Sequence, residues 1–309
     1  MSTVKLAVVQ MFCNPRDKQS NIDKMIGFVQ EAADQGVDLI VFPEESATGF
    51  GTVGVREYSS DDKLYMHEQA ELVPEGPTTQ TMIEQARAHG MYLVYGIAEQ
   101  DAARRQAEYN CVVLVGPEGF VGKYRKTHFP VNERFSHYTG TEFPVFDTAI
   151  GKIGLEVCYD VCFPEVARTL AIKGAEIICS PTCWPNNKGT EDDGSQVTFT
   201  AFPQARAWEN QVFFINANYA TPGATGPTPG AAWGSAIISP IPGRILADAR
   251  YGEHMAVAEI DVAAEIMEAR CNATDGNEML KDRKPGLYGA LVQADPYTYA
   301  FGGGSAPAE

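Results

Sequence analysis

The sequence predicts an α/β fold with either one mixed sheet or two sheets stacked between helices. Apolar runs bounded by glycine alternate with segments whose apolar residues recur three or four positions apart. These are the patterns of buried strands and amphipathic helices. Two further pairs of strands are separated by short turns rich in glycine and proline, which predicts hairpins interspersed among the alternating elements.

The first half of the chain predicts two helices and five strands. Residues 21–33 carry Ile22, Met25, Ile26 and Val29 as one helical stripe. The run over residues 37–42 is continuously apolar, as in a strand covered on both faces. The remaining predicted elements are strands 4–10 and 92–97, a helix over 78–89, and a hairpin of strands 111–115 and 121–124.

The second half predicts a strand–helix–strand unit followed by a further helix, strands and a hairpin. Gly151 precedes the first strand of this unit, and Pro164 suits the first turn of its helix because proline has no N–H to leave unpaired. The predicted unit comprises strand 153–157, helix 164–173 and strand 176–179. Helix 195–210, strand 212–218, hairpin strands 235–238 and 244–247, and strand 255–260 follow.

Length and composition predict one large domain. No linker interrupts the first 295 of the 309 residues, so we expect a single domain over residues 1–301. Residues 302–309 are small and polar, which predicts a disordered tail. Hydrophobic residues make up 44% of the chain, enough for a large core.

Charge and cysteine usage narrow the class of protein. The formal net charge of −16 argues against nucleic acid, whose phosphates need clustered Lys and Arg. The chain has no apolar run of the roughly 20 residues that span a membrane, and its start lacks the features of a signal peptide. Seven thinly spread cysteines fit a reducing compartment. We therefore expect a cytoplasmic protein with no membrane partner.

Glycine-rich nucleotide motifs are missing from the sequence. Neither Gly-x-Gly-x-x-Gly nor Gly-x-x-x-x-Gly-Lys-Ser/Thr follows a predicted strand. The sequence thus implies neither a dinucleotide nor a nucleoside triphosphate.

Cys158 stands where a predicted strand gives way to a helix. Unpaired backbone N–H groups and the positive end of the helix dipole favour a thiolate at such a turn. A lone cysteine of this kind is more often a small buried hydrophobe. Its interpretation as a nucleophile depends on residues elsewhere in the chain.

Two other reactive side chains also follow apolar strands. Glu44 ends one such strand and Lys126 follows another. Taken alone, Glu44 could be a helix cap and Lys126 part of a solvated basic face. Ligands gather at the carboxyl ends of strands in α/β sheets, so the three side chains could converge there. Together they suit acyl transfer from an amide: Cys158 attacks, Glu44 takes its proton, and Lys126 with the backbone N–H of Tyr159 meets the oxyanion.

Three sequence blocks resemble the signatures of the nitrilase superfamily of carbon–nitrogen hydrolases, in that family's order. They are Val41-Phe42-Pro43-Glu44, Tyr124-Arg125-Lys126-Thr127-His128 and Cys158-Tyr159-Asp160-x-x-Phe163-Pro164-Glu165. The similarity continues through Arg206-Ala207-x-Glu209-Asn210 and the hairpin over residues 234–243, so it covers nearly the whole chain.

This resemblance implies a four-layer α-β-β-α sandwich, subunits paired as a homodimer or higher homo-oligomer, and neither metal nor organic cofactor. It implies a Glu-Lys-Cys triad, with Glu44 as general base, Lys126 as stabilising cation and Cys158 as nucleophile. Glu133 resembles a further glutamate that positions the substrate in many members. The implied reaction releases ammonia from a small amide or ureido substrate through a cysteine thioester, which water then hydrolyses.

Two departures from the family pattern bear on the substrate. Cys162 occupies a position where arginine is frequent, so that role is vacant or falls to another residue such as Arg168 or Arg134. True nitrilases commonly place Trp-Glu after the nucleophile, whereas this chain has Tyr159 and Asp160. We therefore expect the amidase or N-carbamoyl amidohydrolase branch, with nitrile hydrolysis as the alternative.

Four side chains are candidates for the substrate pocket, although large aromatics more often pack in cores. The candidates are Tyr138, Trp184, Asn187 and Trp233. The Gly-, Pro- and Thr-rich segment over residues 221–232 is predicted to be a loop that could cover the site.

Two interpretations from other classes remain open. The pairs Cys158/Cys162 and Cys179/Cys183 could hold zinc in a structural domain, although Cys179 lies within an apolar strand. A catalytically silent relative that acts as a binding partner is the other. The complete triad argues against it.

Overall fold

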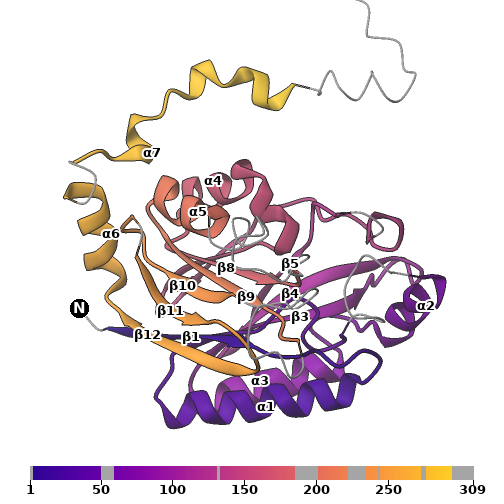
Figure 1. Cartoon of the computed structure of the whole chain (residues 1–309). Helices are drawn as coiled ribbons and strands as arrows, with labels where there is room; N and C mark the ends of the chain where they lie inside the picture. The colour runs from indigo at the N-terminus through magenta and orange to yellow at the C-terminus, as the bar shows by residue number, and fades with distance from the viewer. Residues whose placement is uncertain are drawn as a thin grey trace, which may run out of the picture.

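The computed structural model describes residues 3–49, 59–130, 133–184, 201–221, 234–242, 244–272 and 276–293. Within these ranges the chain forms two six-stranded sheets stacked face to face, with helices on both outer sides (Figure 1). The expectation of two sheets between helices, the α-β-β-α sandwich, is confirmed. The alternative of one mixed sheet is wrong.

The first sheet joins the two ends of the fold. Strand β1 pairs in parallel with β2 and antiparallel with β12, so that Val4 lies opposite Ile260. Strand β5 runs in the same direction as β2, because both β3–β4 and β4–β5 are antiparallel hairpins. In spatial order the sheet consists of β12 (His254–Ile260), β1 (Val4–Gln10), β2 (Leu39–Val41), β3 (Tyr92–Gln100), β4 (Glu108–Gly116) and β5 (Gly119–Arg125).

The second sheet has three parallel strands at its centre, β7, β8 and β9, with antiparallel partners outside them. Parallel strands have their carboxyl ends at one edge, which prepares that edge for a site. In spatial order the sheet consists of β11 (Ile245–Ala249), β10 (Ser235–Ile238), β9 (Phe213–Asn218), β8 (Ile177–Thr182), β7 (Gly151–Leu155) and β6 (Val145–Thr148).

Apolar side chains pack in three layers, one between the two sheets and one between each sheet and its helices. Between the sheets, Leu39 of one meets a cluster that includes Leu155 and Phe213 of the other, all fully buried. Helices α1 (Lys18–Asp34) and α3 (Pro77–His89) cover the first sheet, and α4 (Pro164–Ile172) and α5 (Phe202–Asn210) cover the second. The sequence predicted all four helices because each presents a continuous apolar stripe to its sheet.

Several elements differ from the prediction. Helix α2 (Ser60–Gln69) was missed because it buries few apolar residues, although Ser59 and Asp62 form a capping box that signals its start. Strand β6 and helices α6 (Val262–Cys271) and α7 (Met279–Asp282) were also missed. The described part of the predicted helix 195–210 is α5, and residues 195–200 lie outside the described residues.

None of the helices in the described ranges is both long enough and apolar enough to cross a membrane. The tail over residues 302–309 lies outside the described residues.

Candidate active site

The chain brings the three predicted catalytic residues to one edge of the stacked sheets. Glu44 follows β2, Lys126 directly follows β5, and Cys158 follows β7. Their side chains are nearly sealed from solvent, with residue exposures of 1%, 1% and 5%. In the first sheet β2 and β5 run in the same direction, which places Glu44 and Lys126 at the same edge. Cys158, from the second sheet, interacts electrostatically with both Glu44 and Lys126, so the three residues lie together as predicted.

Two turns at the site hold a residue other than glycine at a positive φ angle. Cys158 opens the 3-10 helix η3 (Cys158–Cys162) with a φ of +50°, the left-handed region that disfavours side chains. Glu45, next to Glu44, has a φ of +49°. A Cβ on Gly96 of β3 would lie 2.1 Å from the Glu45 nitrogen, so only glycine allows this turn to pack against the sheet.

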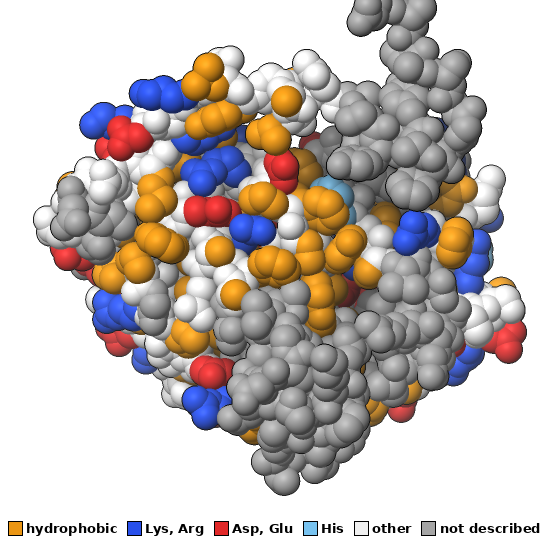
Figure 2. Space-filling model, turned by 45° about the horizontal axis from the view of Figure 1, so that its top comes forward, with side chains coloured by type: hydrophobic (Ala, Val, Ile, Leu, Met, Phe, Trp, Pro, Cys, Tyr) orange, Lys and Arg blue, Asp and Glu red, His pale blue; other side chains and the backbone are white. Residues whose placement is uncertain are grey.

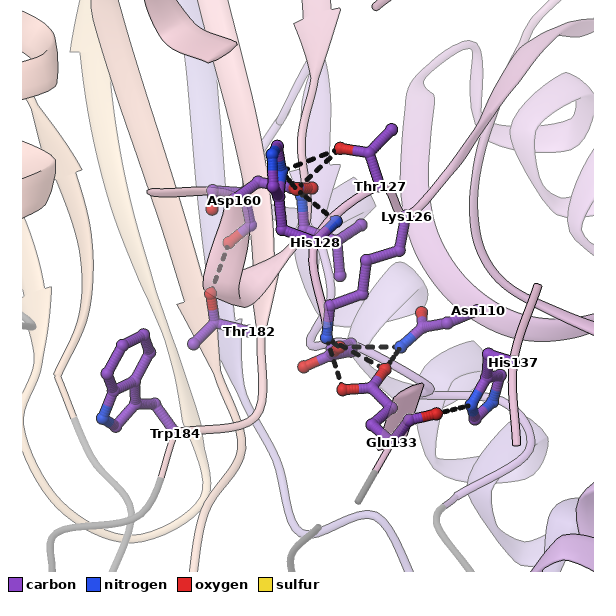
Figure 3. A network of polar contacts seen from close by, with 12 residues as sticks. Asn110, Lys126, Thr127, His128, Glu133, His137, Asp160, Thr182 and Trp184 are labelled. Carbon is purple, nitrogen blue, oxygen red and sulfur yellow. Dashed lines mark hydrogen bonds and ion pairs between the residues drawn. The ribbon is translucent and has the colours of Figure 1, made fainter. Parts of the chain in front are cut away.

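Lys126 is bonded to two buried carboxylates (Figure 3). Its Nζ donates to Glu44 Oε1 at 2.6 Å, and to Glu133 Oε1 at 3.0 Å and Oε2 at 2.8 Å. Glu133, predicted from the family resemblance, is fully buried in the 3-10 helix η2 (Glu133–Phe135). The ammonium thus lies between the expected base and the expected positioning residue.

Asn110 is a site residue that the sequence analysis missed. It projects from β4, and its Nδ2 donates to Glu44 Oε1 at 2.7 Å and to Glu133 Oε1 at 2.8 Å. Its backbone carbonyl accepts the N–H of Lys126 at 2.9 Å. An asparagine within a buried strand gives no local signal, because its partners are distant in sequence.

The electrostatics of the cluster suit proton transfer. Burial raises the pKa of Glu44, and the Glu133 carboxylate raises it further, against the lowering effect of Lys126. Burial also raises the pKa of the Cys158 thiol, as does Glu44, whereas Lys126 and the backbone N–H of Cys183 lower it. Desolvation disfavours the charged form of Lys126, but the two carboxylates raise its pKa well above the ordinary value. The resting thiol is therefore protonated, beside a carboxylate able to take its proton and a permanent cation.

Asp160 links the turn that carries Cys158 to the segment that carries Lys126. Its Oδ2 accepts the N–H of Val157 at 3.0 Å and the hydroxyl of Tyr124 at 2.8 Å. Its Oδ1 accepts the Thr127 hydroxyl at 3.0 Å and the His128 N–H at 3.1 Å, and lies 2.7 Å from His128 Nδ1 (Figure 3). This carboxylate fixes the turn that carries Cys158 relative to the segment that carries Lys126.

Arg206 braces the turn in which Cys162 replaces the frequent arginine. Its Nε donates to the carbonyl of Val161 at 3.0 Å from helix α5. The two arginines suggested by the sequence line other surfaces: Arg168 lines an outer pocket with Arg283, and Arg134 lines a cavity beside α2. The bracing residue in the described structure is thus one that the prediction did not choose.

The pocket candidates are spread over different surroundings. Tyr138 lines a cavity of about 680 Å³ together with Lys63, His67 and Arg134. Trp184 follows β8 and lies away from the Lys126 cluster (Figure 3), with its ring centroid 6.4 Å from that of Tyr159. The other two candidates, Asn187 and Trp233, lie outside the described residues, as does all but the first residue of the predicted loop 221–232.

The zinc interpretation is not supported by the geometry. All four cysteines that it requires belong to the described part of the chain. Among the described residues, no group of three or more His, Cys, Asp or Glu side chains is arranged to hold a metal ion.

Comparisons with known proteins agree with this architecture. The model of the carbon–nitrogen hydrolase family matches residues 5–266. A nitrilase of Pyrococcus abyssi is 35% identical over 92% of this chain and 99% of its own length. Omega-amidase NIT2-A of Xenopus laevis is 32% identical over 87% of this chain and 93% of its own.

A solved structure extends the agreement to three dimensions. Saccharomyces cerevisiae Nit3, a member of branch 10 of the nitrilase superfamily, superimposes with a TM-score of 0.72. It is 27% identical, and the match covers 87% of this chain and 93% of that one. From its sequence match, its fold and its relatives, the chain belongs to the carbon–nitrogen hydrolase family, the nitrilase superfamily.

Proposed function

We propose that this protein is an amidohydrolase that cleaves the C–N bond of a small linear amide or N-carbamoyl compound through a cysteine thioester. The observation that carries the proposal is the buried Lys126 ammonium bonded to Glu44 and Glu133 beside the Cys158 thiol. A thiol, a carboxylate and a cation in a water-poor site are the groups that acyl transfer from an amide needs.

Glu44 begins the reaction by accepting the Cys158 proton as sulfur attacks the carbonyl carbon. Glu44 Oε1 is bonded to Lys126 and Asn110, whereas Oε2 has no hydrogen-bond partner among the described residues and is available for this proton. The negative charge that forms on the carbonyl oxygen rests on Lys126 and the N–H of Tyr159. The C–N bond then breaks, and the proton held by Glu44 leaves with ammonia.

Water completes the cycle. Glu44, ionised again, takes a proton from a water molecule while the oxygen of that water attacks the thioester carbon. The S–C bond breaks, and the thiol regains that proton while the acid departs. An N-carbamoyl substrate would yield a carbamic acid, which loses carbon dioxide.

Amides, N-carbamoyl compounds and nitriles are the candidate substrate classes. The named relatives include a nitrilase and an omega-amidase, and Tyr159 and Asp160 after the nucleophile favour amides over nitriles. Ammonia release should be measured on a panel of primary amides, N-carbamoyl amino acids and nitriles. We expect turnover of at least one amide or ureido compound, with nitriles slower.

Mass spectrometry of acid-quenched enzyme tests the intermediate. During turnover of an amide, the protein should gain the mass of the substrate less ammonia, and Cys158→Ala should gain nothing. Folded protein that releases no ammonia from any amide or ureido compound would instead favour the silent binding partner.

We also expect a cytoplasmic homo-oligomer. Helices α4 and α5 expose Ile172 and Trp208, and the C-terminal segment exposes Leu287, Leu291 and Val292. Hydrophobic side chains spread widely over the face seen in Figure 2, which brings the top of Figure 1 forward. An exposed apolar surface of this kind suits a protein interface. Analytical ultracentrifugation should show at least a dimer, and a monomer at micromolar concentration would contradict the expectation.

A further inference from the structure

All three N–H groups of the Lys126 ammonium have a hydrogen-bond acceptor in the resting site. An ammonium carries three protons, and Lys126 Nζ contacts three carboxylate oxygens: Glu44 Oε1 and both oxygens of Glu133. To donate to the oxyanion of a substrate, it must give up one of these contacts. The contact with Glu133 Oε1, at 3.0 Å, is the longest of the three.

A second donor already serves the oxygen that Lys126 would leave. Asn110 Nδ2 donates to Glu133 Oε1 at 2.8 Å and, with its other proton, to Glu44 Oε1 at 2.7 Å. These are the same two oxygens that Lys126 bridges. Asn110 is fully buried, and its carbonyl holds the backbone N–H of Lys126. One buried residue of β4 thus contacts both carboxylates through its side chain and the backbone of Lys126 through its carbonyl.

We propose that Asn110 is a positioning residue that frees Lys126 for the oxyanion: it keeps Glu44 and Glu133 bridged while the ammonium turns from Glu133 Oε1 to the substrate. This inference rests on the proposed amide hydrolysis. Without Asn110, two buried carboxylates would face each other with Lys126 as the only donor that they share among the described residues. The ammonium would then be held more tightly where it is, and Glu44 would lose a hydrogen bond that favours its ionised form.

Asn110→Leu tests the proposal, because leucine has a similar volume and no N–H. We expect kcat to fall about 100-fold with KM changed little, as for a group whose effect is felt in the transition state. We also expect the acid limb of the pH profile of kcat/KM to move upward by about one pH unit. A purely structural residue would not move that limb.

Asn210→Leu is the matched control. Asn210 is also fully buried, and its Nδ2 donates to a backbone carbonyl, that of Arg206, within α5. We expect this variant to lower the melting temperature without shifting the acid limb. If both variants lose kcat equally with unshifted pH profiles, Asn110 has only a structural role and the proposal is wrong.

A second measurement does not depend on turnover. The rate of Cys158 alkylation by iodoacetamide, followed against pH, reports how readily Glu44 takes the thiol proton. In Asn110→Leu this profile should shift in the same direction, and Asn110→Asp, which keeps the native shape, should shift it too. An unshifted profile in either folded variant overturns the inference, whereas an inactive wild-type enzyme with shifted profiles would overturn only the proposed function.

Discussion

Replacing Asp160 by asparagine should weaken the fold and the reaction together. Asp160 accepts two donors on Oδ2 and has three on or near Oδ1. Asparagine retains one acceptor oxygen. If that oxygen takes the place of Oδ1, the new NH₂ group faces the Val157 N–H and the Tyr124 hydroxyl. The hydroxyl can turn toward Thr127 Oγ1, 2.9 Å away, but the Val157 N–H is left without an acceptor.

The magnitude follows from these contacts. One buried N–H left unpaired costs about 1–3 kcal/mol, and the loss of charge weakens the remaining bonds by a comparable total. We expect a loss of about 3 kcal/mol, or roughly 5 °C in melting temperature for a chain of this size. Because the Val157 N–H precedes Cys158, a displaced turn should also lower kcat/KM by about 100-fold.

Differential scanning fluorimetry and ammonia release measure the two effects on the same preparation. Asp147→Asn is the control, because Asp147 is an exposed carboxylate whose ion pair with Lys152 lies on the surface. It should change neither quantity. An Asp160→Asn variant that melts and turns over like wild type would refute the inference that this carboxylate fixes the turn that carries Cys158.

Three further predictions concern individual side chains. Cys158→Ala should abolish ammonia release with the melting curve retained, whereas Cys162→Ala should keep turnover; equal losses would mean that the nucleophile is misassigned. Glu44→Gln should lower kcat/KM by about 100- to 10,000-fold. In wild type the acid limb of the pH profile of kcat/KM should lie above pH 4.5, because burial raises the pKa of Glu44 and the base works only when ionised. A midpoint below pH 4.5 in a pH titration of kcat/KM would contradict this. Burial and, after it, the nearby Asp160 raise the pKa of Glu156 from 4.5 to about 8, so the folded state keeps this carboxyl neutral up to that pH. The free energy of unfolding of wild type should therefore fall by about 1.4 kcal/mol per pH unit as the pH rises from 4.5 to 8. Glu156→Gln should remove this slope and melt higher than wild type at pH 8, and a lower melting temperature there would count against it.

The sequence was sufficient to predict that Glu44, Lys126 and Cys158 lie close together. Apolar runs ending at residues 42 and 157 identify buried strands, and residues that follow such strands emerge at an edge. For that reason Glu44, Lys126 and Cys158 could be brought together without coordinates. Glu133 was found only through family resemblance, because nothing in its local sequence distinguishes it from a surface glutamate.

Other parts of the site depend on contacts between distant segments. Asn110 lies one residue before the predicted start of its strand at Cys111, and its two carboxylate partners are 66 and 23 positions away. Asp160 stands within a predicted motif, but its role was not predicted, because most of its donors come from β5 and the residues that follow it. Arg206 was likewise passed over as a brace because α5 and η3 meet only in the folded chain. Each of these roles depends on contacts between residues that are distant in the sequence, and local hydrophobic periodicity does not predict such contacts.

The surplus of carboxylates around Lys126 has a consequence for the end of the cycle. With Glu44 ionised, two anions and one cation leave the sealed cluster with an excess negative charge. In the proposed reaction an uncharged amide group would enter this field without opposing a charge of its own, whereas the acid that hydrolysis produces would be repelled once it has lost its proton to solvent. The charges to which we assign the activation of the thiol would thus also expel the product and disfavour the reverse reaction.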